Sequence, residues 1–128
     1  MKAAKYLCTA LVLATLSAPA LADECSHYSS SYDRTFCKSK LFVEADKELN
    51  SVYKNLSAAV KGNTRQILLR SQREWLAYRN SHCESNPGTI DVDCSYRTNQ
   101  ARVEFLRDRL RECKTGNCRA DAIGEKSW

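Results

Sequence analysis

The fold is decided by the stretch LNSVYKNLSAAVKGNTRQILLRSQREWLAYR, residues 49–79. Its first part repeats apolar residues at intervals of three or four, the spacing that places them on one face of a helix. Gly62 and Asn63 then interrupt the pattern, and it resumes at Thr64. Because the connection is so short, the two helices are expected to be antiparallel neighbours.

A third helical pattern follows Pro87 and Gly88, which break the second helix. The expected helices cover roughly residues 36–61, Thr64 to about Cys83, and Cys94 or Ser95 to about residue 115, with Asp33 or Thr35 as the first N-cap. Phe105 lies off the apolar stripe of the third helix, so the C-terminal tail either covers it or leaves it exposed to a partner. The patterns predict an all-α fold, a small bundle of three main helices whose first two form an antiparallel hairpin.

The short turn also sets the register of the first two helices. Residues that face each other across it have numbers that sum to about 125. This register places Asp46, in the apolar stripe of the first helix, opposite Arg79 of the second. A buried acid without a partner costs several kcal/mol, so we expect a structural ion pair between them.

Residues 1–22 have the pattern of a secretory signal peptide. Lys2 and Lys5 precede an uncharged run over residues 7–16, and Ala-Leu-Ala stands at residues 20–22. The run is shorter than the roughly 18 residues that a membrane anchor needs. A lipid anchor is not expected either, because Cys25 does not follow the cleavage site directly. We therefore expect a periplasmic or secreted domain over residues 23–128, with a short C-terminal extension from about residue 114.

Cleavage would change the cysteine count from seven to six, an even number suited to three disulfides outside the cytoplasm. The six are Cys25, Cys37, Cys83, Cys94, Cys113 and Cys118. Cys113 and Cys118 bracket a turn-forming stretch and are expected to pair. The first four gather at one end of the bundle. The orientation of the second helix favours Cys37 with Cys83 and Cys25 with Cys94, while the local pairs Cys25 with Cys37 and Cys83 with Cys94 are the alternative.

The composition excludes several classes of protein. With 43% hydrophobic and 27% charged residues among 128, the chain is a single globular unit rather than a disordered or fibrous one. Only two histidines and no CxxC pair are present, so neither zinc nor another metal is expected. Removal of Lys2 and Lys5 leaves 18 basic and 15 acidic residues, too small an excess to indicate a nucleic-acid partner.

No catalytic arrangement is visible in the sequence. His82 is the neighbour of Cys83 and therefore points elsewhere on a helix, which argues against a cysteine nucleophile. No pair of acids is set apart as a glycosidase would need. We expect no enzyme activity and no cofactor.

The connection between the second and third helices is the best candidate for a binding site. It is acidic, long, and bounded by cysteines at both ends, and a tethered loop makes a good recognition element. The candidate partner-binding residues are Glu84, Asn86, Thr89, Asp91 and Asp93.

Three ordered stretches resemble the LprI-like family of bacterial lysozyme inhibitors. The first runs from Asp46 to Leu56, and the third contains Cys94, Thr98, Arg102 and Leu106. The second is the distinctive one and reads LRxxQxxWxxYRxxxC from Leu69 to Cys83. Across the first two stretches, we interpret Asp46, Gln72, Trp75, Tyr78 and Arg79 as positions that specify the fold. The chain departs from the family's namesake in lacking a lipid-attachment cysteine and in adding Cys113 and Cys118.

The resemblance implies a helical secreted protein that inhibits lysozyme and so protects peptidoglycan. An inhibitor of a basic muramidase would benefit from acidic groups presented near the substrate cleft, which is the role expected for Glu84, Asp91 and Asp93. The alternative is an immunity or envelope-binding protein with a partner other than lysozyme.

Overall fold

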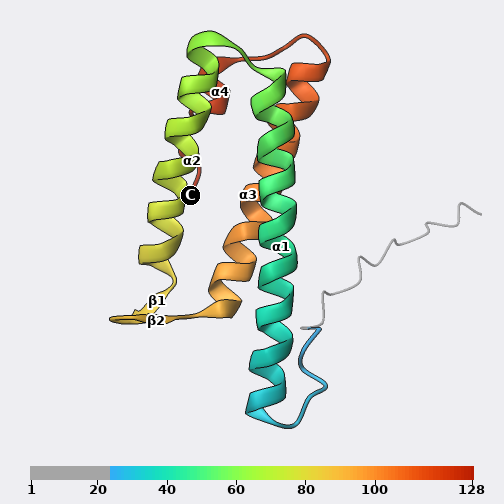
Figure 1. Cartoon of the computed structure of the whole chain (residues 1–128), viewed down its shortest axis with the longest axis vertical. Coiled ribbons are helices and arrows are strands. Elements are labelled where there is room, and N and C mark those ends of the chain that lie inside the picture. Colours follow the sequence, from blue (N-terminus) through green and yellow to red (C-terminus); the bar gives the residue numbers. More distant parts are fainter. Residues whose placement is uncertain (1–23) are drawn as a thin grey trace, which may run out of the picture.

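The computed structural model describes residues 24–128, so the expected signal peptide lies outside the described residues. Three long helices form the body of the molecule (Figure 1). The elements in chain order are α1 (Ser31–Ala59), α2 (Gly62–His82), β1 (Glu84–Asn86), β2 (Thr89–Ile90), α3 (Val92–Lys114) and α4 (Ala120–Ile123). The predicted all-α bundle is confirmed, and a two-stranded antiparallel hairpin is added to it.

The two helices joined by the short turn are antiparallel, as predicted, and α3 runs back alongside α1 (Figure 1). The backbones of α1 and α3 are the closest pair in the bundle. Large side chains fill the space between α2 and this pair, and Trp75 is the largest of them, with 2% of its surface exposed. The hairpin of α1 and α2 is therefore wide, and α2 packs through side chains rather than by close backbone approach.

The core is a continuous apolar cluster contributed by all four helices. Its members are Leu49, Val52, Leu56, Val60, Leu68, Trp75, Val103, Leu106 and Ile123. The α1 members recur every three or four residues, which is the spacing from which the helix was predicted. Most of these residues lie toward the α1–α2 turn, so this end of the bundle is the better packed one.

The predicted ion pair between α1 and α2 is confirmed. Arg79 Nη1 lies 3.2 Å from Asp46 Oδ1 and also donates to Asn99 Oδ1 of α3 at 3.0 Å. Asn99 is fully buried and donates its own Nδ2 to Asp46 Oδ1 at 3.2 Å. One carboxylate thus joins all three long helices.

Both capped helices begin earlier than the apolar pattern predicted. The N-cap of α1 is Ser30, whose hydroxyl accepts from the backbone N–H groups of Tyr32 and Asp33, so neither Asp33 nor Thr35 has the expected role. The N-cap of α3 is Asp91, which accepts from the N–H groups of Asp93 and Cys94 at 3.0 Å. Apolar periodicity marks where a helix packs, whereas the cap marks where it begins, and the first turns here are polar.

The disulfide pairing favoured from the sequence is wrong for two of the three bonds. The structure pairs Cys25 with Cys37 and Cys83 with Cys94, and it pairs Cys113 with Cys118 as expected. In the 125 register Cys37 lies about five residues, or about 7 Å of helix, beyond the level of Cys83. The chain also turns back between Cys83 and Cys94, since the hairpin brings Asp91 N to within 2.8 Å of the Cys83 carbonyl oxygen.

The C-terminal extension packs against the bundle. Ile123 of α4 is fully buried, and a Cβ on Gly124 would lie 2.9 Å from Ile67 Cγ2 of α2, so only glycine allows this close approach. Further on, Trp128 lies near Tyr78, with ring centroids 6.4 Å apart. Phe105 is partly buried against the core and lines a pocket together with Ser127 and Trp128 of the tail, so it is not left fully exposed.

Candidate functional site

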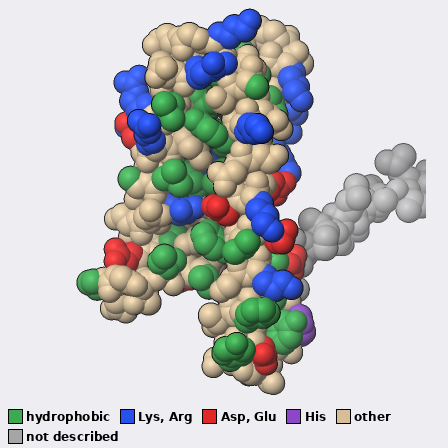
Figure 2. Space-filling model, in the orientation of Figure 1, with side chains coloured by type: hydrophobic (Ala, Val, Ile, Leu, Met, Phe, Trp, Pro, Cys, Tyr) green, Lys and Arg blue, Asp and Glu red, His purple; other side chains and the backbone are tan. Residues whose placement is uncertain are grey.

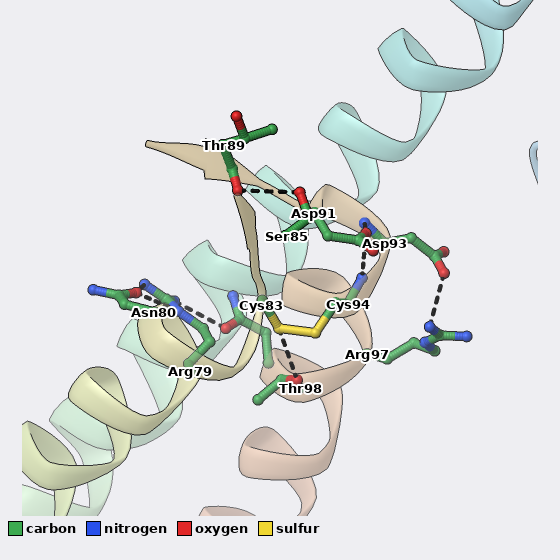
Figure 3. The surroundings of a disulfide bond; sticks show 11 residues. Arg79, Asn80, Cys83, Ser85, Thr89, Asp91, Asp93, Cys94, Arg97 and Thr98 are labelled. Carbon is green, nitrogen blue, oxygen red and sulfur yellow. Dashed lines mark hydrogen bonds and ion pairs between the residues drawn. A yellow bond between two sulfur atoms is a disulfide. The ribbon is translucent and has the colours of Figure 1, made fainter. Parts of the chain in front are cut away.

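The tethered connection is an ordered hairpin rather than an irregular loop. Residues 84–86 pair with residues 89–90, and Gly88 in the turn has a φ of +77°, a conformation that favours glycine. The Cys83–Cys94 disulfide closes its base (Figure 3). The Thr98 hydroxyl lies 3.6 Å from the Cys83 sulfur, beneath the hairpin. The strands were not predicted from the sequence, since nothing in residues 84–90 alternates apolar with polar.

The three acids expected to meet a partner are each engaged within the molecule. Glu84 Oε1 accepts from the N–H of Gly88 at 2.6 Å, and Asp91 caps α3. Asp93 pairs with Arg97 at 3.1 Å and with Lys38 of α1 at 3.4 Å. These contacts stabilise the hairpin and its base. Two cations compensate the charge of Asp93.

Other side chains of the hairpin are exposed to solvent. Asn86 and Thr89 pair across the turn and are both exposed. Ile90 is 67% exposed, which is unusual for an isoleucine held in an ordered strand. It borders a pocket of about 460 Å³ whose other walls include Phe42 of α1 and Arg79 of α2. Ile90 was not among the predicted contact residues, although its place in a cysteine-bounded segment was a usable signal.

The hairpin shares its end of the molecule with a projecting part of α1. The first turns of α1 extend beyond the hairpin (Figure 1). Tyr32, Phe36 and Val43 are separated by four and seven residues, so they lie on one face of this helix, and they are 77%, 59% and 48% exposed. We call the hairpin together with residues 28–43 the open end.

Apolar exposure is concentrated at the open end. Among residues 24–128, the large apolar side chains that are exposed are Tyr28, Tyr32, Phe36, Val43 and Ile90. Figure 2 shows apolar side chains on the projecting part of α1 and at the hairpin. Such a concentration is typical of an interaction surface, because scattered exposure would be spread over both ends.

The motif residues lie inside the bundle and act on its structure. Trp75 is buried, and the ring of Tyr78 stacks on His82 with centroids 5.0 Å apart. Gln72 Oε1 accepts from Arg102 Nε at 3.1 Å, a contact between α2 and α3. Of these positions, Arg79 borders the pocket beside Ile90, so the motif residues meet the open end there.

Two further properties of residues 24–128 bear on function. None of the helices described is long and apolar enough to cross a membrane. No group of three or more His, Cys, Asp or Glu side chains in this part of the chain is arranged to hold a metal ion.

Comparison with known proteins gives one match. No curated protein and no solved structure matches the chain. The family model described as lysozyme inhibitor LprI matches residues 22–106, which include α1, α2, the hairpin and most of α3. Because this match covers well over half of the 128 residues, the chain belongs to the LprI family of lysozyme inhibitors.

Proposed function

We propose that the protein binds and inhibits a lysozyme, and that it does so with the open end. The observation that carries the proposal is the gathering of exposed apolar side chains at this end, on two elements held by disulfides. Membership of the lysozyme inhibitor family supplies the class of partner. The three disulfides and the sequence of residues 1–22 support a place outside the cytoplasm.

The structure changes the expected mode of contact. Glu84, Asp91 and Asp93 organise the hairpin, so we assign them to positioning rather than to direct recognition. Ile90, flanked by Asn86 and Thr89, is the proposed central contact, because buried apolar anchors supply most of the binding energy in interfaces. The disulfide-closed base keeps the ordering cost low when a partner binds.

The first test is inhibition of a panel of lysozymes on cell-wall substrate by the oxidised, folded protein. We expect dose-dependent inhibition at near-stoichiometric protein for at least one lysozyme type. Absence of inhibition across the panel would contradict the proposal and favour a different envelope partner.

The second test locates the surface. Ile90→Ser is expected to raise the inhibitory concentration by about tenfold or more, the effect typical of an anchor residue. Ala58→Ser is the control, since Ala58 is also exposed but lies on α1 near the opposite end. Equal inhibition by both variants, with the fold intact by circular dichroism, would remove the hairpin from the interface. Removing the three acids is a poorer test, because it would also disorder the hairpin.

A further inference from the structure

A second pocket, away from the open end's apolar face, is built around a buried arginine. It has a volume of about 330 Å³ and lies between α2, α3 and the C-terminal segment. Its lining includes Trp75 and Tyr78 of α2, Arg102 and Phe105 of α3, and Trp128. None of these residues belongs to the proposed lysozyme-binding surface.

Arg102 carries a charge that nothing in the described chain neutralises. Only 2% of its surface is exposed, and among residues 24–128 it forms no ion pair. Its Nε and Nη2 donate to Gln72 Oε1 at 3.1 Å and to Ser71 Oγ at 2.9 Å, both of them neutral acceptors. Nη1 forms no hydrogen bond among the described residues, and it is not fully enclosed, because the enclosed polar side-chain atom without a partner there is Arg109 Nε. Buried charges are ordinarily paired, so this is an exception that requires an explanation.

The surroundings of the guanidinium are aromatic. Its Cζ lies 4.7 Å from the ring centroid of Phe105, 5.1 Å from that of Trp128 and 5.7 Å from that of Trp75. Rings of this kind attract a cation but offer no acceptor to its remaining N–H groups. Burial lowers the pKa of Arg102 to about 10, so it is still protonated at neutral pH.

We propose that this pocket binds a small organic carboxylate, with the carboxylate on Arg102 Nη1 and an apolar, planar body between the aromatic rings. A single available guanidinium nitrogen suits one carboxylate oxygen, whereas a phosphate dianion would need several donors. The pocket volume is at the lower end for small-molecule sites and suits a ligand of about one ring.

The test uses the two tryptophans of the chain, Trp75 and Trp128, which both line the pocket. Phenylacetate is titrated into the oxidised full chain while tryptophan fluorescence is recorded, with phenylacetamide as the neutral analogue. We expect a saturable change for phenylacetate and binding of the amide about tenfold weaker or less. Equal binding of the two compounds, or no saturable change with phenylacetate, would overturn the proposal.

A variant pair tests the role of Arg102 without removing it. Thr98 lines the pocket one helical turn before Arg102, so Thr98→Glu places a carboxylate at the spacing that favours an intrahelical ion pair. Thr98→Gln has nearly the same size and no charge. We expect Thr98→Glu to lose phenylacetate binding about tenfold or more and Thr98→Gln to keep it. Similar affinities for both variants would contradict the assignment, and neither measurement involves lysozyme.

Discussion

Two arginines lie near the Trp75 ring, and they differ in how their charge is compensated. Arg79 Cζ lies 5.4 Å from the centre of the indole ring, and Arg102 Cζ lies 5.7 Å from it. Arg79 faces α1 and has Asp46 as its ion-pair partner. Arg102 faces the C-terminal segment and has neutral acceptors only. The compensated arginine, Arg79, joins helices, whereas the uncompensated Arg102 lines a pocket in which an anion would neutralise its charge.

The largest effect is expected from removing the aromatic ring that both arginines contact. Trp75→Ala is expected to lower the free energy of unfolding by about 3 to 5 kcal/mol, because it opens a large cavity and leaves both cations without their shared ring. Urea unfolding followed by circular dichroism measures this change. A loss below about 1 kcal/mol would show that the bundle collapses around the missing ring.

The compensated arginine is tested by Asp46→Ala. Arg79 Nη1 would keep only Asn99 as an acceptor, and Asn99 Nδ2 would lose its partner. Because the Asp46 side chain is 41% exposed and water replaces part of the contact, we expect a loss of about 1 to 2 kcal/mol in the same assay. The control is Glu44→Ala, since Glu44 is 71% exposed and pairs only with Lys47. Equal losses of unfolding free energy for the two variants would show that Asp46 does not stabilise the packing of the three helices.

The uncompensated arginine is expected to respond in the opposite direction. Thr98→Glu adds a carboxylate where Arg102 has none, so it should be more stable than Thr98→Gln by about 0.5 kcal/mol. Thermal unfolding of the two variants side by side measures the difference. If the glutamate variant is the less stable one, Arg102 does not lack a counter-charge.

The smallest expected effect is the pH dependence of phenylacetate affinity. Burial lowers the pKa of Arg102 to about 10, so the cation persists at lower pH and is lost above that value. The other titratable or charged groups lining the pocket are Tyr78 and His82 of α2 and Arg97 of α3. We expect constant affinity from about pH 6 to about pH 9, because Arg102 keeps its positive charge throughout this range. Fluorescence titrations measure this, and an affinity that fell as pH rose within the range would show that Arg102 is not the cation that holds the carboxylate.

Much of the helical bundle was predictable because it depends on local periodicity. The apolar spacing and the short turn at Gly62 predicted the hairpin of α1 and α2, and they also placed Asp46 opposite Arg79. The N-caps at Ser30 and Asp91 were missed, because they lie outside the apolar stripes. The strands at residues 84–90 were missed because a short exposed hairpin has no apolar face to reveal it.

The cysteine-bounded segment was noticed in the sequence, but neither its strands nor the contacts of its acids were predicted. The cysteine-bounded segment forms the hairpin of the open end, yet its acids accept hydrogen bonds in a turn, cap a helix and form ion pairs within the molecule. A carboxylate in a sequence shows its charge but not its partners. Ile90 and Phe36 gained significance only when the fold left them exposed on neighbouring elements.

By itself the sequence determined the helices, their antiparallel turn, the Asp46–Arg79 pair and the resemblance to the LprI family, because each depends on spacing along one or two adjacent helices. Only the tertiary structure decided the disulfide pairs of Cys25 and Cys83, since these depend on how far α1 extends past α2 and on where the chain turns back. It also decided that Arg79 is neutralised and Arg102 is not. The physical reason is that the surroundings of a buried charge come from several elements at once, and no spacing within one helix encodes them.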